Sequence, residues 1–116
     1  MPKTKALYFA SRKQWRSWLA KNHGKEEEVW LTYYSKASGK TGISYDESVE
    51  EAICFGWIDS RVRKIHDVKF IRRFGPRRSK KAWSGFNEER ARKMIRQRKM
   101  TKAGLDMLPS RLKRNI

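Results

Sequence analysis

A six-residue run of β-branched and aromatic side chains, Val29–Tyr34, is the strongest strand signal in this chain of 116 residues. Such a run is typical of a strand whose two faces are both at least partly covered. Segments with helical periodicity lie on either side of it, and each begins with a serine followed three residues later by Gln or Glu. The chain therefore alternates between helix-forming and strand-forming segments.

The two serines mark helix starts. Ser11 with Gln14, and Ser44 with Glu47, have the spacing of a capping box, in which both side chains satisfy free amides of the first turn. After Ser11 the apolar stripe is Trp15, Trp18 and Leu19, and Gly24 follows as a helix stop.

After Ser44, the residues Tyr45, Val49, Ala52 and Ile53 share one helix face, which predicts that Glu50 and Glu51 face water. Asn87 is the expected N-cap of a later helix, with Ala91, Met94 and Ile95 as its apolar stripe.

Residues 57–65 and 68–74 are predicted strands joined by a tight turn near His66-Asp67. Together with the helices they predict an α+β fold, in which a small antiparallel sheet of about three strands packs against helices. The length favours a single domain. We expect residues 1–10 to be a lead-in, residues 11–108 the folded domain, and residues 109–116 a basic tail.

Positive charge is concentrated in the second half of the chain. The formal net charge is +17, and residues 61–116 hold twenty basic and four acidic side chains, whereas residues 25–60 hold three basic and eight acidic. A sequence pI near 10.5 is typical of proteins that bind nucleic acid. The alternative is a solvated basic surface without a specific ligand.

The basic residues of the hairpin, the loop after Pro76 and the helix after Asn87 are the candidate polyanion-binding set. Arginine offers paired hydrogen bonds to phosphate, and the nearby rings of Phe70, Phe74 and Trp83 either stack on unpaired bases or belong to the core. The candidate residues are Arg61, Arg63, Arg72, Arg73, Arg77, Arg78, Lys80, Lys81, Arg92 and Arg96.

Signals for other chemistry are weak. The loop 37–42 lacks the spacing of a phosphate-binding P-loop. Asp59, Ser60 and His66 are close in sequence, but Asp59 and Ser60 would point to opposite faces of a strand. The single cysteine, Cys54, is expected to be a buried, inert thiol, and no metal site or cofactor is predicted. No segment has the length and apolarity of a membrane span, and a cytoplasmic location is expected.

Motifs spread from Phe9 to Leu105 resemble the YdeI/OmpD-associated, or bacteriocin-protection, family of the YjbR/CyaY-like group. The run Cys54–Ser60 is the most specific, while Phe74-Gly75-Pro76 departs from an expected Phe-Thr-Pro. The other matching motifs are Trp15–Leu19, Asn22-His23, Glu28–Leu31, Ile43–Tyr45, Glu50–Ile53, Pro76–Arg78, Trp83-Ser84, Asn87 and Ala103–Leu105.

This resemblance implies a YdeI-like α+β domain with helices on one side of a small sheet, in a cytoplasmic prokaryotic protein linked by name to stress or bacteriocin tolerance. It implies no established reaction. Trp57, Asp59 and Ser60 are positions of interest whose roles it does not define.

Three hypotheses follow. The first is a non-catalytic domain that binds nucleic acid or another polyanion. The second is a protein-interaction domain with an acidic partner. The third is a small-molecule enzyme with a cleft near Trp57, Asp59 and Ser60, which ranks last because no base, nucleophile and electrophile set is visible.

Overall fold

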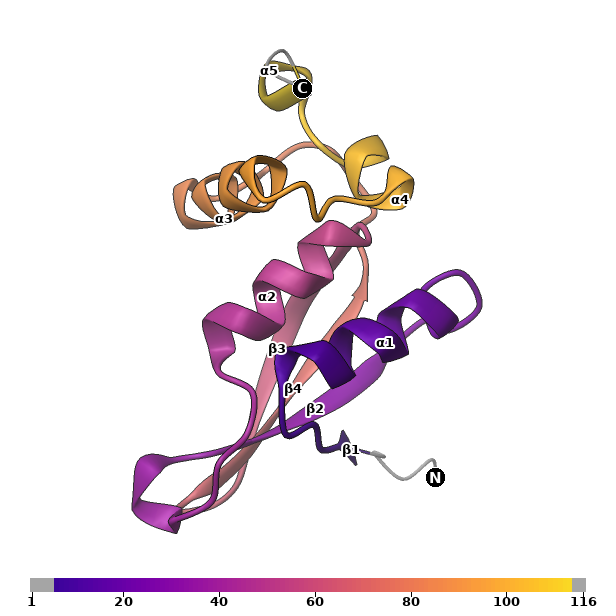
Figure 1. Ribbon diagram of the computed structural model, residues 1–116. Coiled ribbons are helices and arrows are strands. Elements are labelled where there is room, and N and C mark those ends of the chain that lie inside the picture. The colour runs from indigo at the N-terminus through magenta and orange to yellow at the C-terminus, as the bar shows by residue number, and fades with distance from the viewer. Residues whose placement is uncertain (1–5, 114–116) are drawn as a thin grey trace.

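The structure, a computed structural model, describes residues 6–113. One sheet with the strand order β1-β2-β4-β3 lies behind helices α1 and α2, and α3, α4 and α5 lie beyond one end of the sheet (Figure 1). The elements in chain order are β1 Ala6–Leu7, α1 Arg12–Asn22, β2 Val29–Tyr34, the 3-10 turn η1 Lys36–Ser38, α2 Tyr45–Cys54, β3 Trp57–His66, β4 Lys69–Pro76, α3 Gly85–Arg96, α4 Lys102–Asp106 and α5 Ser110–Lys113.

The α+β class and the single domain predicted from the sequence are confirmed. The sheet differs in one respect, because it has four strands and is mixed. Strand β1, within the expected lead-in, pairs parallel to β2 with Leu7 opposite Leu31. Two residues are too few for an alternating pattern to be visible in the sequence. The remaining pairs, β2 with β4 and β4 with β3, are antiparallel as expected.

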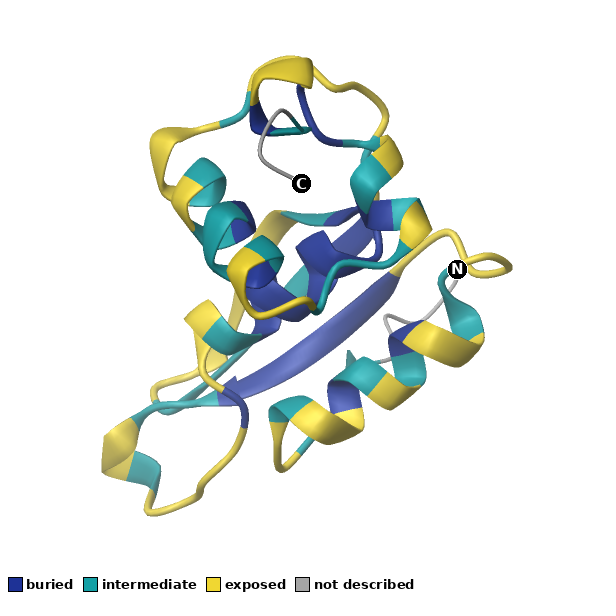
Figure 2. Ribbon diagram, turned by 45° about the horizontal axis from the view of Figure 1, so that its top comes forward, coloured by how far each residue is buried: buried dark blue, intermediate teal, exposed yellow. Residues whose placement is uncertain are grey.

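The main core lies between the sheet and helices α1 and α2. Trp15 and Leu19 of α1 and Val49 of α2 are fully buried against Leu31 of β2 and Phe74 of β4. Figure 2 shows the buried residues gathered along β2 and α2, with exposed residues at the loops and the outer helix surfaces. The helical stripes predicted from the sequence therefore point at the sheet.

The serine caps behave largely as their motifs predict. Ser44 and Glu47 form a complete capping box. Ser11 accepts from the Gln14 amide, but the Gln14 side chain accepts from Ala10 rather than from Ser11 itself. The predicted cap at Asn87 is wrong, because Ser84 caps α3 by accepting from the Asn87 amide at 3.1 Å. Gly85, a weak helix former, lies in the first turn of α3 and obscures the earlier start in the sequence.

The prediction that Glu50 and Glu51 face water is also wrong. Both are buried, with 5% and 0% of their surface exposed. Helix α2 packs against α1 on one side and against α3 on another, so the helix face opposite its apolar stripe is covered as well. A pattern read along one helix cannot show that a later helix will cover its polar side.

Cations from three directions neutralise these two carboxylates. Glu51 pairs with Arg12 at 2.6 Å, with Arg16 at 2.8 Å and with Lys99 at 2.5 Å. Arg12 also reaches Glu50 at 2.9 Å, and Lys93 of α3 reaches Glu50 at 3.0 Å. We call these residues the carboxylate cluster.

Burial alone would raise the pKa of Glu51, but hydrogen bonds from Lys99, Arg16 and Arg12 outweigh it and hold that pKa below its usual value. The carboxylate is therefore ionised in the folded protein.

The C-terminal helices also close on the core. Leu108 and Leu112 are buried, so the expected basic tail packs in part against the domain, while residues 1–5 and 114–116 of the expected lead-in and tail lie outside the described residues. Gly104 of α4 lies so close to the end of α2 that a Cβ there would be 2.3 Å from the Cys54 carbonyl oxygen. Only glycine fits at this contact.

Glu51→Gln should strongly destabilise the fold, because the buried amide leaves three partly buried cations without their counter-charge. We expect a loss of about 3–5 kcal/mol in the free energy of unfolding at pH 7, measured by urea denaturation. Glu26→Gln, at an exposed position, is the matched control and should change little.

Acidification tests the same cluster. Because folding lowers the pKa of Glu51, its contribution is present above the ordinary carboxyl pKa of 4.5 and is lost as the pH falls through the lower folded value. The gap between wild type and Glu51→Gln should therefore narrow below pH 4.5. A gap that stays constant on acidification would contradict this assignment.

Gly104→Ala should destabilise the protein by about 1–3 kcal/mol, because the new methyl group must displace backbone at the end of α2. Gly85→Ala in α3 is the control, since nothing lies within 4 Å of its added Cβ. That change should be neutral or stabilise by up to ~1 kcal/mol. The midpoints of chemical denaturation measure both, and equal effects would argue against close packing of α4 on α2.

Candidate nucleic-acid interface

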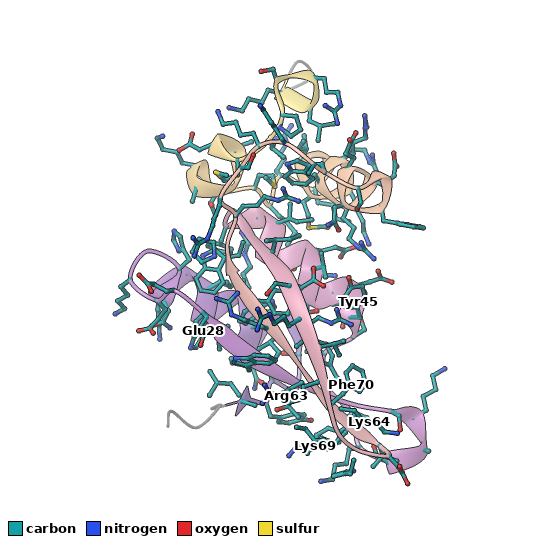
Figure 3. The ribbon with its side chains drawn as sticks, turned by 180° about the vertical axis from the view of Figure 1, so that it is seen from behind. Glu28, Tyr45, Arg63, Lys64, Lys69 and Phe70 are labelled. Carbon is teal, nitrogen blue, oxygen red and sulfur yellow. The ribbon has the colours of Figure 1, made fainter. Side chains whose placement is uncertain are left out.

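Among the described residues, no helix crosses the face of the sheet that points away from α1 and α2 (Figure 3). Side chains alternate between the two faces of a strand, so β2 sends Val29, Leu31 and Tyr33 to the helices and its other residues outward. We call this outward side the open face. Its residues are Trp30, Thr32, Tyr34, Arg61, Arg63, Lys69, Ile71 and Arg73.

The strand register sets cations beside rings on the open face. Trp30 of β2 is opposite Arg73 of β4, which is in turn opposite Arg61 of β3. At the other end of β2, Tyr34 is opposite Lys69. Directly opposed residues share a face, so each ring has a cationic neighbour within reach across the sheet.

Long charged side chains cover the apolar centre of this face. Trp30 is only 9% exposed and Ile71 only 3%, although neither belongs to the core under the helices. The Arg63 guanidinium lies 5.4 Å from the centre of the Trp30 ring. Arginine stems bury apolar surface while their charged heads remain in contact with solvent. The cover of Trp30 is thus charged and lies at the surface.

Arg73 is anchored by two side chains. Its Nε donates to Glu28 at 2.5 Å, and its Nη1 donates to the Ser60 hydroxyl at 3.1 Å. A β-bulge between Asp59 and Arg61 places Ser60 on the same face as Arg73. About half of the Glu28 side chain is exposed, so this pair is open to competition by a ligand.

A second ring and cation pair lies at the far end of β2. The Lys40 ammonium is 4.7 Å from the centre of the Tyr34 ring, and Tyr8 packs edge-on against Tyr34 with 5.7 Å between ring centres. The Tyr8 hydroxyl donates to the Thr41 carbonyl, which ties the loop after η1 to this edge. The open face therefore ends in a half-exposed tyrosine beneath a lysine.

At the opposite end, a hollow of about 230 Å³ lies between Arg73 and Arg78, with Glu27, Gly75 and Pro76 completing its lining. Arg78 is exposed in the loop after β4. Guanidinium groups can hold a phosphate with two parallel hydrogen bonds, and this hollow is placed to admit one.

Two of the predicted arginines have local structural partners instead. Arg72 lies on the helix side, where it pairs with Asp59 at 3.0 Å and lies 4.5 Å over the Tyr45 ring. Arg77 lies 4.0 Å over the Trp83 ring and donates to the carbonyls of Ser79 and Lys81. Burial lowers the pKa of Arg77, with a smaller opposing effect from Asp59. These arginines hold the local structure in place.

The remaining predicted cations form other groups. Lys80 and Lys81 are exposed in the loop that Arg77 holds. Arg92 and Arg96 of α3 line a cavity of about 250 Å³ together with Arg111 of α5. Arg111 is paired with Glu88, and Arg92 is within 4 Å of both Glu88 and Glu89. The predicted set is therefore divided between the open face, the helix side of the sheet, the loop and α3.

The rings predicted as possible stacking residues do not lie on the open face. Phe74 is fully buried, Phe70 stacks on Tyr33 on the helix side, and Trp83 is covered by Arg77. The expectation that both faces of Val29–Tyr34 are at least partly covered is confirmed, because only Tyr34 of this run is not buried. Trp30 and Tyr34 were nevertheless not predicted as site residues. Trp30, Thr32 and Tyr34 alternate with Val29, Leu31 and Tyr33, and Thr32 is the only residue of the run whose polarity marks the outward face.

A hydrolytic triad is not assembled. Asp59 accepts from Tyr45 and Arg72 on the helix side, whereas Ser60 contacts Arg73 on the open face. His66 lies at the hairpin end of β3, seven residues from Asp59 and so roughly 23 Å along the strand. Trp57 is a core residue whose indole donates to the His23 carbonyl.

The cysteine is buried as predicted, and burial raises the pKa of its thiol to about 11, so Cys54 is protonated at neutral pH. Within residues 6–113 no group of three or more His, Cys, Asp or Glu side chains could hold a metal ion. None of the helices in that range is long and apolar enough to cross a membrane.

Comparison with protein-family models matches residues 7–107 to a family described as Domain of unknown function (DUF8412). No curated protein and no solved structure matches the chain. The matched range extends from β1 to the end of α4 and so contains the whole open face and the carboxylate cluster.

Proposed function

Since this chain belongs to the DUF8412 family, whose description assigns no activity, we propose from its surface that it binds nucleic acid through the open face of its sheet. The observation that carries the proposal is the alignment of Arg61, Arg63 and Arg73 on a sheet face that no helix crosses within the described residues. Phosphate contacts from such a surface fix a polyanion without reading its sequence.

The positions of the acidic residues support the proposal, because several of them form ion pairs on the helix side of the sheet. Glu50 and Glu51 are neutralised inside the carboxylate cluster, Asp59 pairs with Arg72, and Asp46 pairs with Arg90 at 2.5 Å. Of the acidic side chains near the open face, Glu28 is shared with Arg73 and Glu27 lines the hollow. The cations of the open face therefore outnumber these two carboxylates.

Positively charged side chains also lie at both ends of the open face. Arg78 and Arg73 flank the hollow beyond Gly75, and Lys40 lies over Tyr34 at the other end. A backbone that ran along β2 would meet cations at both ends as well as at the centre. We also propose that the protein is cytoplasmic. Nucleic acid is present in that compartment, and a free cysteine stays reduced there.

The open face is a better candidate for nucleic-acid binding than the basic cavity lined by Arg92, Arg96 and Arg111. There Arg92 and Arg111 already face Glu88 and Glu89, and a ligand anion would have to compete with both carboxylates. The two further proposals from the sequence, an acidic protein partner and membership of the YdeI-like group, are compatible with the same surface. We rank the acidic partner second because its carboxylates would use the same arginines.

The triple variant Arg61→Gln, Arg63→Gln and Arg78→Gln should weaken binding to a 20-nucleotide oligonucleotide, measured by fluorescence anisotropy over a salt series. Each lost phosphate contact lowers the slope of log affinity against log salt by about 0.7–0.9, so a decrease of roughly 2–3 is expected. The control is Lys13→Gln, Lys21→Gln and Lys25→Gln, which removes the same charge from exposed positions on and after α1.

Absence of binding at low salt would end the proposal, and so would an equal loss in the control triple. Polyglutamate of matched length and charge is titrated in parallel to test the acidic-partner alternative. If it binds as tightly as the oligonucleotide, the surface recognises negative charge in general, and the second-ranked function becomes the better one.

A further inference from the structure

The rings on the open face are covered in a way that differs from the ring-on-ring packing under the helices. Under the helices, Trp15 packs ring against ring with Trp18 and Phe74. On the open face, Trp30 lies beneath the Arg63 guanidinium and Tyr34 beneath the Lys40 ammonium. A cation therefore lies over each of these two rings, and Tyr8 borders Tyr34 only at its edge.

Other cations that lie over rings are less exposed. Arg77 over Trp83 is partly buried and donates to two carbonyls, and Arg72 over Tyr45 is partly buried and paired with Asp59. Arg63 and Lys40, in contrast, are both exposed. The covers of Trp30 and Tyr34 are the ones that a ligand can reach.

Exchange of such a cover for a nucleobase is favourable. A cation over a ring at an exposed site is worth only about 2- to 5-fold in an equilibrium constant. A base stacked on an aromatic side chain contributes about 5- to 150-fold to affinity. The displaced guanidinium or ammonium keeps its charge and can then pair with the neighbouring phosphate, so its charge still contributes to binding.

The two rings also share one strand and one face. Trp30 and Tyr34 are four residues apart on β2, which is roughly 13 Å, with the small side chain of Thr32 between them on the same face. Bases that are paired in a duplex present edges to a protein and keep their flat faces stacked on one another. Only unpaired bases can lie flat on both rings.

We propose that the open face selects single-stranded nucleic acid, with one base stacked on Trp30 and another on Tyr34 while Arg63 and Lys40 move to the adjacent phosphates. This rests on the proposed function and adds to it the class of ligand. The stacking platform is sequence-tolerant, because every base has a flat face to offer.

The test compares Trp30→Leu with Trp30→Phe on a 12-nucleotide oligothymidylate, the matching oligouridylate and a duplex of equal length, by anisotropy at low salt. Trp30→Leu should weaken single-strand binding by about 5- to 150-fold and leave duplex binding within about twofold. Trp30→Phe keeps a flat ring and should retain most of the affinity. The oligothymidylate and oligouridylate arms show whether DNA or RNA is the better strand.

Tyr34→Leu with Tyr34→Phe is the second pair, at a position that is half-exposed, and it decides the question should Trp30→Leu fail to fold. Circular dichroism reports the folding of each variant. A duplex bound as tightly as the single strand would overturn the inference, as would leucine variants that lose nothing or that weaken both ligands equally. In those cases the arginine triple still tests phosphate binding by itself, whereas no binding to any oligonucleotide at low salt removes both proposals.

Discussion

Two adjacent carboxylates inside α2 hold the helical layer together. An ionised glutamate without partners would cost several kcal/mol to bury, so Glu51 can be buried only if Arg12, Arg16 and Lys99 come with it. These cations belong to α1 and to the segment after α3, and Lys93 of α3 adds its charge to Glu50. The positions of α1 and α3 on α2 are therefore coupled through charge as well as through apolar packing.

The cluster also shapes the outside of the molecule. Carboxylates that are held on the helix side cannot neutralise cations on the far side of the sheet, and the screening length of about 8–10 Å in physiological salt limits their influence there. The same alternation that sends Leu31 and Phe74 inward sends Trp30, Arg61 and Arg73 outward. A buried acidic centre and a basic open face are thus two results of one arrangement.

Local signals in the sequence predict much of this fold. Side chains that act within one turn, such as Ser44 with Glu47, and the apolar run of β2 are sufficient to predict their elements, because the interactions that determine them lie close in the chain. Strand β1 was missed because two residues carry no pattern, and Glu50 and Glu51 were misplaced because their partners lie up to 48 residues away.

In the candidate site, too, local features were predictable from the sequence and long-range contacts were not. The basic hairpin was predicted, but not that Arg72 and Arg73 point to opposite sides, with Arg72 committed to Asp59. The residues of β2 that face outward are determined by which side of the sheet the helices cover. That is a property of the tertiary structure and cannot be read from β2 alone. The choice of Trp30 over Phe70 and Phe74 as an outward ring could be made only once the register of β2 and β4 was known.

The strand order leaves β3 at one edge of the sheet, with a row of backbone groups that a second copy could pair with. Long edge strands of this kind invite edge-to-edge association and, in the end, fibril growth. Exposed cations at Arg61, Arg63 and Lys64 along this edge would be brought beside the same charges of a second molecule in any such pairing. Repulsion between like charges at this edge opposes such pairing, and a polyanion that neutralised the arginines would weaken that repulsion.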